Sequence, residues 1–178
     1  MTLAYQEYYT VADYTHWQGD WELIEGMPYA MSPSPSVSHQ VVSTNLVAII
    51  KNSLTANKAC GSCITLMETD WHVSNDTIVR PDVMIVCNIT GEKVITTPEL
   101  IIEVVSSSST KRDESMKFEL YQQEGVPYYI LVYPQLRLAK VYYNQGDQFN
   151  KTGDFSNKAA HFDMKTCQLS VDFSAIWR

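Results

Sequence analysis

The chain has 178 residues, of which 45% are hydrophobic and 11% aromatic, so it can bury a full core as one domain and is neither disordered nor collagen-like. No apolar run reaches the ~18 residues that a membrane helix needs, and the polar segment Met1–Gln6 does not resemble a secretory signal, so we expect a cytoplasmic protein with no membrane partner. The net charge of −7 argues against a non-specific polyanion binder but leaves room for a local basic cleft.

The N-terminal segment predicts a short helix followed by a hairpin. Thr10 is the expected N-cap of a helix over Thr10–Trp17. Trp21–Gly26 and Met27–Met31 follow as two short strands. The two prolines of Ser32–Ser36 deny that segment helical dihedrals and ladder donors, which makes it an internal loop.

One long helix and three strands are expected in the middle of the chain. Apolar residues at helical spacing predict a helix from His39 to about residue 54, with Ser38 as its N-cap. Strands over Cys63–Val73 and Ile78–Cys87 come next. The nearly continuous apolar segment Glu99–Ser106 predicts a strand that is buried on both faces of a sheet.

A second helix is expected over about Lys111–Glu124, with Thr110 and Asp113 forming a capping box and Gly125 just beyond its end. Four more strands complete the chain, the last two of them peripheral: Pro127–Tyr133, Leu136–Tyr143, Asp147–Phe155 and Cys167–Val171. This order predicts an α/β or α+β fold around one mixed sheet with flanking helices. We expect a single domain, 1–178, with its core at about 20–143 and peripheral strands in 144–178.

The four cysteines are too few for a disulfide framework. Cys60 and Cys63 have the spacing of a metal knuckle, but no second Cys or His pair supplies the other two ligands of a structural zinc. A thioredoxin-like pair lies between a strand and the start of a helix, whereas this pair follows a helix and enters a strand. We therefore expect ordinary thiols at Cys60 and Cys63.

Two acids stand out because they interrupt apolar strands. Glu103 lies inside the most apolar strand, and Asp82 follows Arg80 and Pro81 at the start of another. A buried, unpaired carboxylate costs roughly several kcal/mol, so it needs a cation, a hydrogen-bond network or an exit to solvent. On adjacent strands the two acids would lie within ~4–6 Å, where a divalent cation makes their proximity tolerable. Alternatively, each acid pairs with a neighbour such as Arg80 or caps a turn.

The second helix adds further candidates. Glu114, Lys117 and Tyr121 share one face of it. Lys111 and Arg112 stand at its N-terminus, where the helix dipole also attracts anions. This face is either part of a site or an ordinary solvated surface.

Pro81-Asp82, followed later by Glu103-Val104-Val105, resembles the Pro-Asp…(Asp/Glu)-X-Lys signature of the restriction-endonuclease-like phosphodiesterases, the PD-(D/E)XK superfamily. More closely, the chain resembles the Uma-type restriction endonuclease family over most of its length, from about Thr10 to Tyr143. The resemblance rests on five segments in order: Glu22–Gly26, Met31–Pro35 with His39, Arg80–Asp82, Pro98–Ser106 and Asp113–Tyr129.

The resemblance implies a core in the order α-β-β-β-α-β, in which Asp82 and Glu103 hold Mg²⁺ or Mn²⁺. Val105 occupies the position where the signature has its lysine. Related families place this lysine on the following helix, which makes Lys117 the candidate here. Asp82, Glu103 and Lys117 are therefore the expected catalytic residues.

The resemblance also implies residues around this centre. His39 resembles an additional metal or substrate ligand, and Glu25 is a weaker candidate for the same role. Lys111 and Arg112 are expected to contact the phosphate backbone of a substrate, with Tyr121 beside the catalytic lysine.

The function implied is metal-dependent cleavage of phosphodiester bonds in nucleic acid, with DNA as the expected substrate. One alternative is a non-catalytic binding or scaffold protein of the same fold with a decayed active site, which the acidic net charge and Val105 favour. A second alternative is a carboxylate-pair hydrolase such as a glycosidase. A homodimer is expected, because a two-fold pair matches the symmetry of a duplex site.

Overall fold

The computed structural model describes residues 7–31, 34–106 and 109–177, so Ser32 and Pro33 of the predicted loop lie outside the described residues. Within these ranges, no helix has the length and apolar character needed to cross a membrane. The elements follow in the order α1 (Val11–Tyr14), β1 (Trp21–Ile24), β2 (Met27–Ala30), α2 (Val37–Ala56), η1 (Lys58–Cys60), β3 (Cys63–Met67), β4 (Trp71–Ser74), β5 (Thr77–Val79), β6 (Val83–Cys87), β7 (Leu100–Val104), η2 (Arg112–Met116), α3 (Lys117–Gln123), β8 (Tyr128–Tyr133), η3 (Pro134–Leu136), β9 (Leu138–Asn144), β10 (Phe149–Phe155), β11 (Ala159–Asp163), β12 (Gln168–Asp172) and η4 (Phe173–Ala175).

A mixed sheet of six strands, in the order β10-β9-β8-β7-β6-β3, forms the centre of the molecule. Strands β7 and β8 are parallel, and their neighbours pair antiparallel. Strand β7 lies between β6 and β8, so Glu103 is in the middle of the sheet, as the sequence predicts. The run α2-β3-β6-β7-α3-β8 confirms the expected α-β-β-β-α-β order, with β4 and β5 inserted between β3 and β6.

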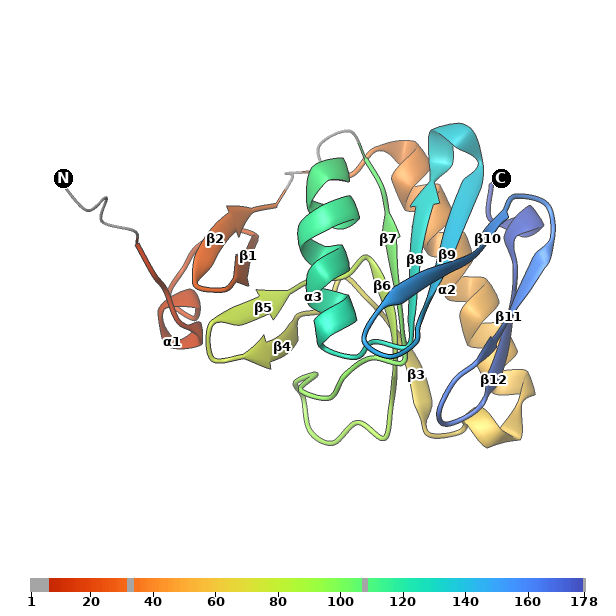
Figure 1. Cartoon of the computed structure of the whole chain (residues 1–178), viewed down its shortest axis with the longest axis horizontal. Coiled ribbons are helices and arrows are strands. Elements are labelled where there is room, and N and C mark those ends of the chain that lie inside the picture. Colours follow the sequence, from red (N-terminus) through yellow and green to blue (C-terminus); the bar gives the residue numbers. More distant parts are fainter. Residues whose placement is uncertain (1–6, 32–33, 107–108, 178) are drawn as a thin grey trace.

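A second sheet, in the order β2-β1-β5-β4, belongs to what we call the N-terminal lobe, residues 7–31 and 68–80. The lobe includes α1 and projects from one side of the body (Figure 1). Its strand β1 is joined to β5 through the pairing of Leu23 with Ile78. This pairing brings an N-terminal strand next to the chain segment that leads into β6.

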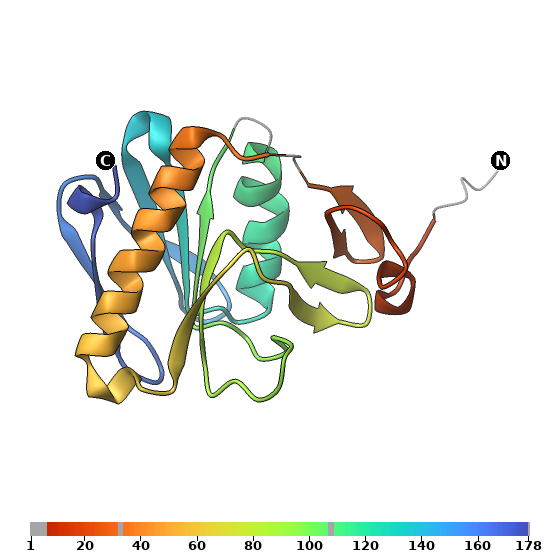
Figure 2. The same ribbon diagram turned by 180° about the vertical axis from the view of Figure 1, so that it is seen from behind.

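Two apolar layers cover the central sheet. On one face, α2 and the β11–β12 hairpin pack on Leu100, Ile102 and Val104. On the other face, α3 packs on Ile101 and shares its cluster with residues of the lobe. Helix α3 therefore lies in front of the sheet in Figure 1 and α2 in front of it in Figure 2. Since side chains alternate along β7, Glu103 faces α3.

Two of the expected strands are wrong in extent. Segment Cys63–Val73 divides into β3 and β4, and segment Ile78–Cys87 divides into β5 and β6. In both cases one half joins the central sheet and the other the lobe. Glu68, with φ of 45°, turns the chain in the first segment. Pro81 lacks the N–H that a continuous ladder would need in the second.

The start of α2 also differs from the prediction. The helix begins at Val37, and the amide of His39 donates to Ser36 Oγ at 3.2 Å. Ser36 is therefore the N-cap, and the assignment of Ser38 is wrong. Thr10 is confirmed as the N-cap of α1, with a capping box to Asp13.

All four cysteines are disulfide-bonded, so the expectation of ordinary thiols is wrong. Cys63 and Cys87 are register partners on β3 and β6, with Cα atoms 3.9 Å apart. Cys60 bonds to Cys167, 107 residues away, and so ties the end of η1 to the segment before β12. Each half of the Cys60–Cys63 motif bonds to a remote cysteine, which spacing within the motif does not reveal.

Candidate active site

A pocket of about 300 Å³ opens where β6 begins and β7 ends. Its walls also include residues of strand β1, of the segment before α2 and the first turn of that helix, and of the segment from Ser106 to Lys117. Five residues expected from the sequence line it: His39, Asp82, Glu103, Arg112 and Lys117. The fold therefore brings most of the predicted site together.

Two crossed hydrogen bonds join Asp82 and Glu103. The amide of Asp82 donates to Glu103 Oε2 at 3.3 Å, and the amide of Val104 donates to Asp82 Oδ2 at 2.7 Å. Each carboxylate is thus held by the backbone of the other acid's segment. The acids converge as predicted for residues on adjacent strands, and the backbone fixes their relative position.

Lys117 lies among three carboxylates. Its Nζ is 2.8 Å from Glu22 Oε1, 3.0 Å from Glu103 Oε1 and 3.8 Å from Asp113 Oδ1. Burial opposes the ammonium charge, but these carboxylates outweigh it and hold the pKa of Lys117 above its ordinary value. Burial also raises the pKa of Glu103, although Lys117 opposes that shift. The site therefore contains a resident cation within an acidic cluster.

Glu22 belongs to this cluster, and the sequence prediction missed it as a site residue. It is fully buried on β1 and also accepts hydrogen bonds from the Arg112 guanidinium at 3.0 Å and the Arg80 amide at 2.9 Å. Burial favours the neutral acid, yet Lys117 outweighs it and lowers the pKa of Glu22. The signal that marked Glu103, an acid among apolar strand residues, is also present at Glu22.

Asp113 is the third partner of Lys117, and its position follows from a turn of π-helix. Across η2, the amide of Lys117 donates to the carbonyl of Arg112, five residues earlier in the chain, a form that recurs at functional sites. The predicted capping box is wrong, because the Thr110 hydroxyl donates to the Ser106 carbonyl and Asp113 is buried. Burial raises the pKa of Asp113 to about 6, against the opposing effect of Lys117.

His39 and Tyr121 each contact one of the paired acids. His39 Nε2 is 3.2 Å from Asp82 Oδ2, while its Nδ1 is 3.4 Å from the Ser43 hydroxyl. Burial lowers the imidazole pKa, but Asp82 outweighs it and the net shift is upward. The Tyr121 hydroxyl donates to Glu103 Oε1 at 2.9 Å. Tyr121 is fully buried, so it orients Glu103 from behind the pocket.

Other predicted residues lie at the margin. The Arg112 guanidinium donates to Glu22 and to the Ala30 carbonyl. Lys111 is exposed and does not line the pocket. Glu25 is also exposed, in the β1–β2 turn with φ of 50°, and does not line the pocket either.

The donors present fit a divalent cation held by two acids. Asp82 uses Oδ2 for both of its contacts, and its Oδ1 has no hydrogen-bonding partner in the described part of the chain. Mg²⁺ is commonly bound by one or two carboxylates together with water and substrate phosphate. Over the described ranges, no group of three or more His, Cys, Asp or Glu residues is arranged as a metal site. The fit therefore rests on Asp82 and Glu103, and a metal role for His39 stays a prediction.

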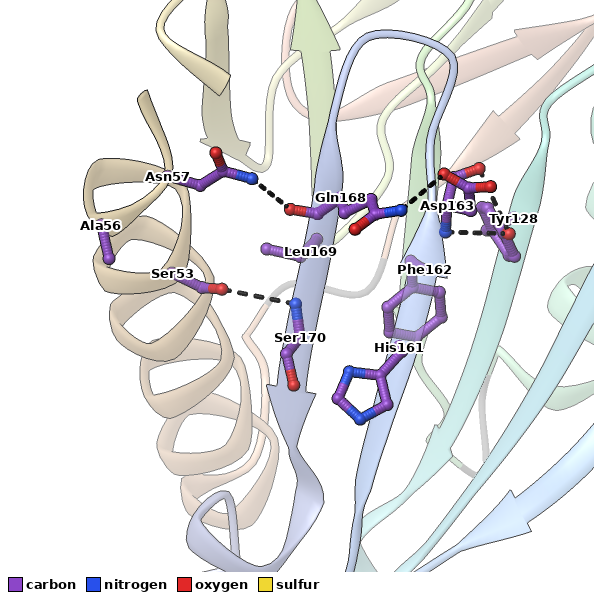
Figure 3. Close-up of a pocket in the computed structure, with 10 residues that line it drawn as sticks. All are labelled: Ser53, Ala56, Asn57, Tyr128, His161, Phe162, Asp163, Gln168, Leu169 and Ser170. Atoms are coloured by element: carbon purple, nitrogen blue, oxygen red, sulfur yellow. Dashed lines mark hydrogen bonds between the residues drawn. The ribbon is translucent and has the colours of Figure 1, made fainter. Parts of the chain in front are cut away.

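A larger hollow, of about 590 Å³, lies between α2 and the β11–β12 hairpin. Figure 3 shows that its polar groups bond to one another: Asn57 to the Gln168 carbonyl, the Ser170 amide to Ser53, and the Gln168 side chain to Asp163. It lacks the buried charges of the first pocket. The pocket around Asp82 is therefore the candidate site.

Comparison with known proteins gives a match to a family model and matches to solved structures. The Uma2 family model, described as "Putative restriction endonuclease", matches residues 5–160. The chain is also similar to a crystal structure described as "a putative nuclease belonging to DUF820" from Anabaena variabilis, with a TM-score of 0.75, 16% sequence identity, and coverage of 95% of this chain and 97% of that one. At that identity the likeness shows the fold. No curated protein matches the chain.

Proposed function

The chain belongs to the Uma2 family, and from that premise we propose that it is a metal-dependent phosphodiesterase that hydrolyses phosphodiester bonds in nucleic acid, with DNA as its substrate. The observation that carries the proposal is the convergence of Asp82 and Glu103 on one pocket beside the buried ammonium of Lys117. The description of the family as restriction endonucleases supports DNA as the polymer.

Asp82 and Glu103 would hold Mg²⁺ or Mn²⁺. When bound, such an ion lowers the pKa of a coordinated water and neutralises charge that develops on the phosphate. Lys117 and Tyr121 both donate to Glu103 Oε1, which directs Oε2 toward Asp82. The Val104 amide holds Asp82 Oδ2 and leaves Oδ1 for a ligand.

The remaining residues set charge and position. Lys117 stabilises the ionised forms of Glu22 and Glu103 by direct contact. His39 would hold a proton at Nε2 against Asp82. Exposed Lys111 would contact a flanking phosphate, and a two-fold homodimer would place two such sites on a duplex.

A non-catalytic protein of the same fold is the second candidate, and the pairing of the cations favours it. Lys117 faces three carboxylates, Arg112 donates to Glu22, and the Arg80 guanidinium is 2.7 Å from both Asp20 and Asp70. Cations paired in this way are not aimed at a phosphate. In that case the acids would serve the fold alone.

Manganese binding, measured by calorimetry, separates the two candidates. We expect saturable binding by the wild type, and its loss in Asp82→Asn and Glu103→Gln. Glu119→Gln is the matched control, because Glu119 is an exposed acid on α3 and should be dispensable. Cleavage of plasmid DNA, single-stranded DNA and RNA with Mn²⁺ then identifies the substrate.

Two results would reject the phosphodiesterase. One is an absence of Mn²⁺ binding by the wild type, which would leave the non-catalytic protein. The other is cleavage that persists in Glu103→Gln at the wild-type rate, which would move the chemistry to other residues.

A further inference from the structure

The N-terminal lobe has a net charge of −7, the same as the net charge of the whole chain. Residues 7–31 and 68–80 contain eight of the 20 acidic residues but only one of the 13 Lys and Arg residues. The rest of the chain has twelve acidic and twelve basic residues, and so has no net charge. Five of the lobe's acids are exposed: Glu7, Asp13, Asp20, Glu25 and Glu68. The lobe therefore attracts cationic partners and repels phosphate.

An aromatic pocket of about 290 Å³ opens on this lobe, lined by Tyr9, Trp17, Gln18, Trp21 and Pro28. The ring centroid of Trp17 is 5.3 Å from that of Tyr9, at an interplanar angle of 82°, and 5.9 Å from that of Trp21, at 67°. Rings at such angles form adjacent walls of a box. Boxes of this kind hold cations against the negative faces of the rings.

The pocket is built in advance by local hydrogen bonds. The Trp21 indole N–H donates to the Gln18 carbonyl at 2.8 Å, and the Tyr14 hydroxyl donates to the Trp21 carbonyl at 3.0 Å. The lobe's single Lys or Arg side chain, that of Arg80, is paired with Asp20 and Asp70. That guanidinium is therefore already held in two ion pairs.

We propose that the lobe is a docking surface for a basic polypeptide segment. One Lys or Arg side chain of that segment would enter the aromatic pocket and lie against Trp17 and Trp21, and further basic residues would meet the exposed acids. The aromatic pocket shares no lining residue with the pocket around Asp82, and the proposal does not depend on phosphodiesterase activity.

The test is a titration of ¹⁵N-labelled protein with an octalysine peptide at low salt, followed through the four tryptophan indole resonances. We expect the Trp17 and Trp21 signals to shift, while those of buried Trp71 and of Trp177, outside the lobe, stay unchanged. Trp17→Leu should weaken binding by about tenfold, the loss of roughly one cation–π contact. Trp177→Leu is the matched control and should bind as the wild type does.

Three outcomes would overturn the proposal. The first is no shift with octalysine. The second is an equal shift of all four signals, which would indicate diffuse attraction without a pocket. The third is a shift of Trp17 and Trp21 with an eight-nucleotide single-stranded DNA and not with octalysine, which would make the lobe a base-stacking surface. Because the wild-type titration decides each of these, the result does not rely on a variant folding.

Discussion

Lys117 acts at the scale of a single residue as an internal counter-ion. Removing one partner of a buried ion cluster leaves uncompensated charge in a region that excludes water. We expect Lys117→Met to lower the free energy of unfolding by about 3–5 kcal/mol, because Glu103 loses its cation and Glu22 keeps only Arg112. Urea unfolding at neutral pH measures the loss.

The control for this prediction is Lys151→Met. Lys151 pairs with Asp154 at 2.7 Å, but both side chains are largely exposed, so its removal should cost less than about 1 kcal/mol. Equal losses in the two variants would contradict a special role for the buried cluster.

Asp113 should make stability depend on pH. Its pKa in the folded state is about 6, above the ordinary 3.8, so between these values the folded state holds a proton that the unfolded state has released. Raising the pH through this window therefore destabilises the fold. Asp113→Asn cannot ionise, and its free energy of unfolding should rise relative to the wild type by on the order of 2 kcal/mol from pH 4 to 6.

The measurement is urea unfolding at pH 4, 5, 6 and 7 with a chelator present. Asp154→Asn, a change at an exposed acid, is the comparison. If the free energy of unfolding changes with pH by the same amount in both variants relative to the wild type, the pH dependence of stability does not come from Asp113.

At the scale of elements, the N-cap of α2 provides a sharp test because two serines compete for the role. Ser36 Oγ accepts from the His39 amide, whereas Ser38 lies half-buried within the first turn, with its Oγ 3.1 Å from that of Ser36. We expect Ser36→Ala to cost about 1 kcal/mol of unfolding free energy and Ser38→Ala a few tenths at most. Thermal unfolding of both variants checks this, and the reverse order would restore Ser38 as the cap.

The sequence predicts the central strands well because their apolar runs are unambiguous. It does not predict where two of the strands divide, since apolar residues continue on both sides of Arg80-Pro81 while the partners change from one sheet to another. Strand β11 is not predicted, for a related reason. Residues such as Ala159 and His161 have a low intrinsic preference for strands, and they form one here because they pair with β12. The local sequence pattern does not show which strand a segment pairs with.

The same limit applies to the site. Asp82 and Glu103 are predictable because each acid stands next to or within an apolar strand, Asp82 just before β6 and Glu103 inside β7. Glu22 joins them only through the pairing of Leu23 with Ile78, a contact between distant segments. The prediction that Lys117 takes the place of the signature lysine stays a prediction, and its Nζ lies 3.0 Å from Glu103. Lys111 and Glu25 share the right sequence neighbourhood, yet they do not line the pocket.

At the scale of the whole molecule, the two disulfides close spans of different length. Cys60–Cys167 joins residues 107 positions apart and Cys63–Cys87 joins residues 24 apart. If they act by restricting the unfolded chain, removing the first pair with serines should cost about 5 kcal/mol and removing the second about 3.5 kcal/mol. Urea unfolding of the two double variants measures the difference. Wild type that unfolds at the same urea concentration with and without dithiothreitol would contradict both crosslinks.

The crossed hydrogen bonds between Asp82 and the β7 segment have an evolutionary consequence. Since each carboxylate is bound by the backbone opposite, these two acids fasten β6 to β7 whether or not any reaction takes place. A lineage of this family without catalytic activity would still be under selection to keep them for folding. Their persistence in such a lineage would reflect their role in the fold. A shared pair of acids would therefore be a poor guide to which relatives are catalytically active.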